Sequence, residues 1–99
     1  MGHTKIHKTA AARVGIDKPV FHKVVTVKPL EHFLLEVSFK DGSRKKYDVT
    51  PLFSKWEAFL ALRDTPGLFD LVAVEPGGYA ISWNDEIDLS ADELWNNGK

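Results

Sequence analysis

A regular alternation of side chains marks the stretch from residue 33 to residue 39. Every second residue is large and apolar, from Phe33 to Phe39, while Glu36 and Ser38 lie between them. A period of two is expected of a β-strand that buries one face. The pattern therefore predicts a strand, and the polar residues that follow predict the turn that ends it.

The Asp41-Gly42 pair after this strand can form either of two hairpin turns. A two-residue turn would set the apolar side chains opposite charged residues of the returning strand. A type I turn with Gly42 as a left-handed bulge instead pairs Leu35 with Tyr47 and brings the apolar faces together. A one-residue slip would turn every side chain over. We therefore predict the bulged hairpin over residues 32–49.

A β-branched run at residues 24–27 predicts a further strand before this hairpin. Residues 28–31 would form the connecting turn, with Pro29 at its second position, where the fixed φ of proline is suitable. The first half of the chain is therefore predicted to form a three-stranded antiparallel meander.

Two helix-start signals follow the hairpin. Thr50-Pro51 can open a helical turn, because proline lacks only a donor that would be unsatisfied there. Residues 54–57 have the sequence of a capping box, so a helix is expected over residues 55–63. The stripe that would face the sheet consists of Leu52, Trp56, Phe59, Leu60 and Arg63.

The second half of the chain follows the same order of strands and then a helix. Three strands are predicted at residues 71–75, 79–83 and 87–89, with a turn at residues 76–78. A capping box that begins at Ser90 predicts a last helix carrying Leu94 and Trp95. The predicted fold class is α+β, with two small antiparallel β-meanders and short capped helices packed on the sheet.

Length and composition favour a single α+β domain at residues 21–99, preceded by a flexible basic arm at residues 1–20. The 99 residues are 43% apolar and include no cysteine, which fits a reducing compartment. No apolar stretch is long enough to span a bilayer. We therefore expect a cytoplasmic protein that does not contact a membrane.

The net charge of −1 hides an asymmetry along the chain. Residues 1–23 sum to +4 and the remaining residues sum to −5. A basic arm can contact nucleic acid, and the cations that would do so are Lys5, Lys8, Arg13 and Lys18. The alternative interpretation is a solvated tail, which is typical of termini without motifs.

Several short motifs occur together in an order that resembles one bacterial family. They are Lys28-Pro29-Leu30, Phe39-Lys40-Asp41-Gly42, Tyr47-Asp48-Val49, Pro51-Leu52, Leu62-Arg63-Asp64, Phe69, Ile81-Ser82-Trp83 and Ile87-Asp88-Leu89. Over residues 24–95 this order resembles domain of unknown function family 2442 (DUF2442). The family usually follows the tryptophan with a proline-containing turn, which this chain lacks. The resemblance implies a small α+β protein without an established activity, of a regulatory or antitoxin-like kind.

No pattern of residues predicts a catalytic centre, which would need a nucleophile beside a base or carboxylates held apart at a pocket. We therefore expect no catalytic residue, no cofactor and no metal site. Asp85, Glu86 and Asp88 crowd carboxylates near one turn, but without the glycine of a calcium loop. A small enzyme is left as a third alternative, after a protein-interaction module and a nucleic-acid-binding accessory protein.

A small protein partner is the interaction that the sequence favours. Tryptophan is enriched at binding hot spots, so the candidate contact residues are Trp83, Asp85 and Trp95. Core packing is the alternative interpretation for both tryptophans. A homodimer is a further expectation, formed through the edge strand predicted at residues 71–75, because an uncovered strand edge can pair with another chain.

Overall fold

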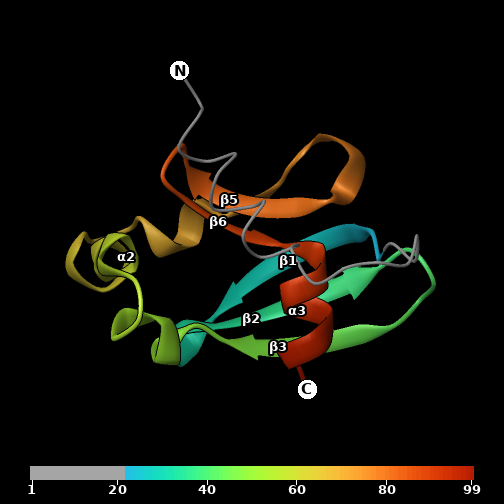
Figure 1. Cartoon of the computed structure of the whole chain (residues 1–99), viewed down its shortest axis with the longest axis horizontal. Helices are drawn as coiled ribbons and strands as arrows, with labels where there is room; N and C mark the ends of the chain where they lie inside the picture. Colours follow the sequence, from blue (N-terminus) through green and yellow to red (C-terminus); the bar gives the residue numbers. More distant parts are fainter. Residues whose placement is uncertain (1–21) are drawn as a thin grey trace.

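The structure, a computed structural model, describes residues 22–99 (Figure 1). The predicted arm at residues 1–20 lies outside the described residues, as do Lys5, Lys8, Arg13 and Lys18.

The first sheet is a three-stranded antiparallel meander. It consists of β1 (Val24–Leu30), β2 (Leu34–Phe39) and β3 (Arg44–Asp48), in the order β1-β2-β3. Leu35 pairs with Tyr47, and Glu36 pairs with Lys46. The predicted register is therefore confirmed, and the buried face of this hairpin is the apolar face read from the sequence.

The turn between β2 and β3 has the predicted glycine bulge. Gly42 has a φ of +95°, and its N–H donates to the carbonyl of Phe39. The N–H of Phe39 donates to the carbonyl of Ser43, which closes the ladder beyond the turn. Asp41 Oδ1 accepts the N–H of Ser43 at 2.8 Å. Glycine supplies the positive φ, and the aspartate satisfies a donor that the bulge leaves unpaired.

The turn predicted at residues 28–31 is wrong, because β1 continues through Pro29 to Leu30. Pro29 faces Leu35 at the edge of the sheet, where a proline is tolerated because its missing N–H is not required by the ladder. The chain reverses later, in a 3-10 turn at Glu31–Phe33, with φ of 61° at His32 and 59° at Phe33. The ring of Phe33 packs edge-on against Phe53 and Phe69, which holds this reversal against the core.

The predicted helical turn at Thr50-Pro51 is present as a 3-10 helix at Thr50–Phe53. The capping box at residues 54–57 is wrong, because the hydroxyl of Ser54 donates backward to the carbonyl of Pro51. Trp56 is extended, a 3-10 turn occupies Glu57–Phe59, and α2 spans only Leu60–Asp64. Trp56 is therefore 55% exposed and does not join the predicted apolar stripe, whereas Phe59 does.

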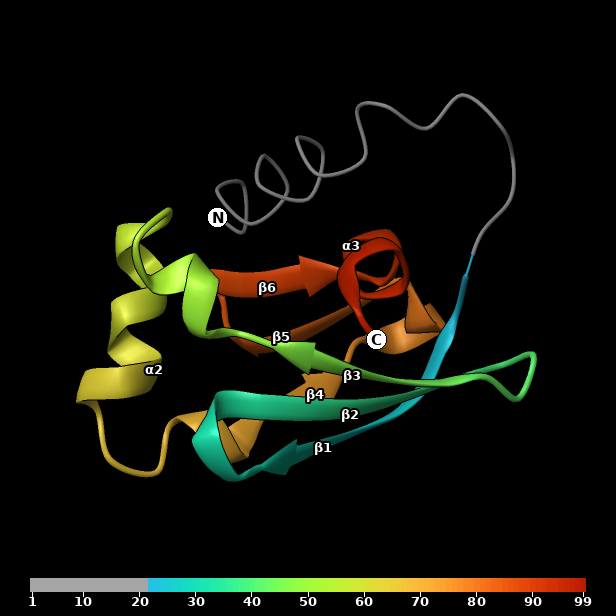
Figure 2. The ribbon, with the colours of Figure 1, turned by 90° about the horizontal axis from the view of Figure 1, so that it is seen from below.

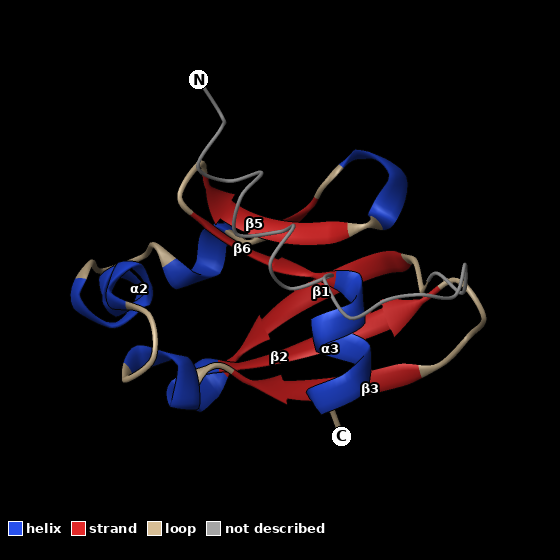
Figure 3. Ribbon diagram, viewed as in Figure 1, coloured by secondary structure: helices blue, strands red, loops and turns tan. Residues whose placement is uncertain are grey.

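The second sheet is also an antiparallel meander, as predicted, and consists of β4 (Ala73–Val74), β5 (Ala80–Asn84) and β6 (Ile87–Ser90). The first strand is shorter than expected, because a 3-10 turn takes up Phe69–Leu71. A second such turn, Pro76–Gly78, connects β4 with β5. The two sheets lie next to each other, with β1 beside the second sheet and β3 at the far edge of the first (Figure 3).

Helix α3 (Ala91–Asn97) follows β6 directly. Ser90 caps it as predicted, since its hydroxyl accepts the N–H of Glu93 at 3.1 Å. The carboxylate of Glu93 does not reach back to the cap but accepts the hydroxyl of Tyr47 at 2.7 Å. This contact ties α3 to β3, and Figure 2 shows α3 on one side of the first sheet and α2 at one end.

The core is shared between both sheets and the helices. Its most deeply buried large side chains are Leu35, Val37, Val49, Leu62, Ile81, Ile87 and Leu94. The fold is therefore α+β, with two three-stranded antiparallel sheets and short helices, as the sequence predicts.

Candidate interaction site

Trp83 lies in the core. Its side chain is 7% exposed, it packs against Phe59 and Phe69, and its indole N–H donates to the carbonyl of Phe69 at 3.0 Å. The polar atom of the indole is therefore satisfied inside the protein, as is usual for a buried tryptophan. Trp83 has little surface with which to contact a partner, so its contribution is to packing.

Trp95 lies at the surface of α3 and is half-buried between two other side chains. The imidazole of His22 stacks on it, with ring centroids 3.9 Å apart and planes inclined by 5°. The ammonium of Lys45 lies 4.5 Å from the indole centroid and donates to the carbonyl of Trp95 at 2.7 Å. Phe39 meets the indole edge-on at 5.0 Å. Trp95 thus fastens α3 to both the start of β1 and the middle of β3.

Asp85 is exposed in the tight connection between β5 and β6. The side-chain oxygen of Asn84 organises that turn, accepting the N–H groups of Glu86 and Ile87. Asp85 and Trp95 lie beyond opposite ends of β6, and Trp83 is inside the core. The three residues predicted to bind a partner therefore do not form one surface.

The outer edge of β3 is the feature with the clearest capacity for binding. The N–H of Phe39 donates to the carbonyl of Ser43, and the N–H of Val49 donates to the carbonyl of Phe33, so Ser43 and Val49 face β2. By the alternation of an antiparallel ladder, the backbone groups of Lys45 and Tyr47 also point toward β2. Those of Arg44, Lys46 and Asp48 therefore point away from the sheet.

Within residues 22–99, one backbone hydrogen bond to this edge is present. The N–H of Lys99 donates to the carbonyl of Lys46 at 2.8 Å, which confirms that Lys46 presents its backbone outward. Its amide and those of Arg44 and Asp48 have no partner among the described residues. The edge that the sequence predicts to pair with another chain is instead the one at residues 71–75.

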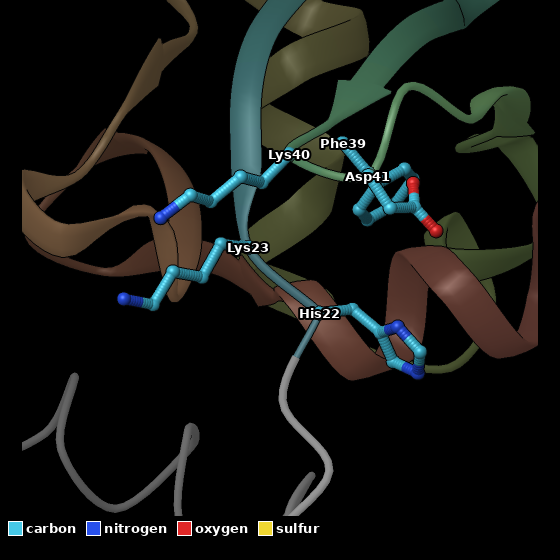
Figure 4. Close-up of a pocket in the computed structure, with 5 residues that line it drawn as sticks. All are labelled: His22, Lys23, Phe39, Lys40 and Asp41. Carbon is cyan, nitrogen blue, oxygen red and sulfur yellow. The ribbon is translucent and has the colours of Figure 1, made fainter.

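A small cleft lies beside the turn of the β2–β3 hairpin, where β1 begins. It is lined by His22, Lys23, Phe39, Lys40 and Asp41 and has a volume of about 350 Å³ (Figure 4). We call it the His22 cleft. No sequence pattern marks it, because residues 22–23 and 39–41 meet only once β1 pairs with β2 and the N–H of Lys40 bonds the carbonyl of Lys23 at 2.8 Å.

Two ionisable groups of the hairpin have shifted pKa values. Hydrogen bonds from Ser43 hold the pKa of Asp41 below its usual value, so this carboxylate is charged at neutral pH. Burial, together with the hydrogen bond to Glu93, raises the pKa of Tyr47 well above its usual range. Tyr47 therefore stays protonated and donates to Glu93, which is a structural role.

Two further properties of the described residues bear on the site. Residues 22–99 contain no group of three or more His, Asp or Glu side chains placed to hold a metal ion. Among these residues, no helix has the length and apolar character that a membrane crossing needs.

The architecture defines the class of protein: a small α+β protein built from two antiparallel meanders. The chain belongs to the family described as Protein of unknown function (DUF2442), whose model matches residues 24–99. Neither the curated proteins nor the solved structures contain a significant match to the chain.

Proposed function

We propose that the chain is a cytoplasmic, non-catalytic protein-interaction module of a regulatory, antitoxin-like kind, and that its partner adds a strand to the edge of β3. The observation that carries this proposal is the row of outward N–H groups at Arg44, Lys46 and Asp48. An added strand would displace the N–H of Lys99 from the Lys46 carbonyl. Main-chain pairing at such an edge supplies affinity, and the side chains beside it supply specificity.

The charges beside the edge indicate the chemistry of the partner strand. Arg44 and Lys46 are exposed on β3, and Lys45 between them is already engaged by Trp95. Exposed lysine on an edge strand discourages pairing with arbitrary apolar segments. The same charges favour a strand that carries acidic residues opposite them. The partner is therefore a small protein with an acidic, extended segment.

The edge of β3 is a better candidate for this role than the edge of the second sheet. The strand predicted at residues 71–75 consists of two residues, Ala73 and Val74, and it lies beside β1. β3 has five residues and forms the outer edge of its sheet (Figure 1). A homodimer, if it forms through a strand edge, is accordingly proposed to pair two copies of β3 rather than two copies of β4.

Two substitutions at one position separate the backbone contact from the side-chain contact. Lys46→Pro removes the outward N–H, whereas Lys46→Thr removes the same charge and keeps the N–H. The ladder to β2 survives in both, and Pro29 already occupies an edge strand of this sheet. Tagged protein expressed at its native level should retain a stoichiometric partner as Lys46→Thr and lose it roughly tenfold as Lys46→Pro, since a backbone bond is lost and the ring obstructs the edge.

Melting curves of the two variants serve as the control for folding. If both variants melt together and both keep the partner, the edge of β3 is not the contact. If the unaltered protein repeatedly recovers no stoichiometric partner, the interaction module itself is contradicted.

A further inference from the structure

The His22 cleft is a second place in the molecule that can hold a ligand, and it lies apart from the edge of β3. We propose that this cleft binds a phosphate group. The cleft is formed by the start of β1 and by the turn of the central hairpin, so both of its walls belong to one hydrogen-bonded unit.

Lys23 and Lys40 line this cleft, and both side chains carry their ammonium groups to one side of it (Figure 4). The backbone bond between Lys40 and Lys23 sets the two residues next to each other. The ammonium of Lys23 lies 5.2 Å from the centroid of the Tyr79 ring, a cation–π contact that limits where it can move. Paired point charges of this kind suit a phosphate dianion, for which lysine is a common ligand.

The other wall of the cleft contains one carboxylate, that of Asp41, which is already hydrogen-bonded within the turn. Asp41 Oδ1 accepts the N–H of Ser43 and faces the turn, away from the two lysines (Figure 4). His22 is held in place by its stacking on Trp95, and its ring lies on the opposite side from the two ammonium groups (Figure 4). The cations of the cleft therefore outnumber its carboxylates.

Charge along the chain supports an external anion as the occupant. Residues 22–48 contain six Lys or Arg and four Asp or Glu, whereas residues 49–99 contain three and nine. Among the described residues, the net positive charge therefore falls on the part of the chain that forms the cleft. Residues 1–21 carry Lys5, Lys8, Arg13 and Lys18 against Asp17. This net positive segment is a poor ligand for a cleft that contains two lysines. A negatively charged ligand from outside the chain fits better.

Titration of the full chain with sodium phosphate at about pH 7.5, where phosphate is largely a dianion, tests the proposal. Amide chemical shifts of Lys23, Lys40 and Asp41 are followed, with sodium chloride at equal ionic strength as the reference. Lys23→Gln and Lys40→Gln should each weaken binding about fivefold, as expected for one exposed ion pair. Lys28→Gln removes the same charge from an exposed position on β1 and should change binding less than about twofold through screening alone.

Saturating shifts that depend on Lys23 and Lys40, but not on Lys28, support the proposal. Chloride shifts of the same size, or equal losses in all three variants, would overturn it, because the response would then reflect ionic strength. If Lys23→Gln unfolds, Lys40→Gln decides the result, since its side chain is exposed. Acetate binding as tight as phosphate binding would also contradict the assignment to a dianion.

Two further ligands distinguish the source of the phosphate. A nucleoside monophosphate presents a free dianion, and a short single-stranded oligonucleotide presents backbone diesters. Tighter binding of the monophosphate would identify a small molecule. Tighter binding of the oligonucleotide, falling steeply with salt and sensitive to Lys40, would identify a nucleic-acid backbone. Neither result depends on a partner at β3, so this proposal can fail while the interaction module stands.

Discussion

Replacing Trp83 by alanine is expected to lower the free energy of unfolding by about 3–5 kcal/mol, the usual loss for a large aromatic residue in a core. The side chain is buried against Phe59 and Phe69, and its N–H satisfies a carbonyl. Alanine would leave a cavity beside these rings and an unpaired carbonyl at Phe69. Urea denaturation of the variant and the parent measures the difference.

Trp56→Ala is the matched control, because Trp56 is the same residue type with 55% of its surface exposed. Its expected effect is within about 0.5 kcal/mol, as for surface substitutions in general. If the two alanine variants lost similar stability, the assignment of Trp83 to the core and of Trp56 to the surface would be wrong.

Gly78→Ala is expected to cost roughly 2–4 kcal/mol, the sum of backbone strain and overpacking. Gly78 has a φ of +77°, and a Cβ placed on it would lie 2.6 Å from the carbonyl oxygen of Val24. This glycine is where the turn before β5 approaches the beginning of β1. Because backbone atoms form both sides of the contact, the two sheets would have to separate locally.

Gly67→Ala distinguishes the steric contact from the strain. Gly67 has a similar φ of +84°, but a Cβ there meets no atom within 4 Å. Its expected cost is about 1–2 kcal/mol, from the left-handed backbone alone. Thermal unfolding of the two variants should show the larger loss for Gly78→Ala. Equal losses would mean that the close approach of the two sheets is not tight.

The central hairpin could be predicted to the residue because two independent patterns agree on one register. Alternation selects the buried face, and the Asp41-Gly42 pair selects the turn that keeps that face on both strands. Ser90 was also predictable, since a helix cap is a local hydrogen bond. The family resemblance is confirmed over residues 24–99.

Elements that depend on tertiary contacts were not predictable in the same way. The reversal at His32 and Phe33 uses left-handed backbone in two residues without a turn signature, and it is held by packing of Phe33 on Phe53 and Phe69. Trp56 follows a capping sequence, yet the hydroxyl of Ser54 bonds backward and the helix begins later. Sequence patterns report the preferences of residues that are close along the chain, whereas the conformation of these residues depends on contacts with residues distant in the sequence.

The candidate site shows the same division. The edge position of β3 follows from the predicted meander, but the freedom of its backbone groups depends on what else packs there. The His22 cleft depends on the pairing of β1 with β2 and has no local signal. Trp95, expected as a partner contact, instead joins His22 and Lys45.

Amide hydrogen exchange along β3, in the free protein and in the complex with the co-purified partner, tests the central claim most directly. In the free protein the amides of Arg44, Lys46 and Asp48 should exchange at least roughly tenfold faster than those of Lys45 and Tyr47, which bond β2. In the complex the amide of Lys46 should become as slow as its neighbours. A Lys46 amide that is already slow in the free protein, or that stays fast in the complex, would contradict strand addition at β3.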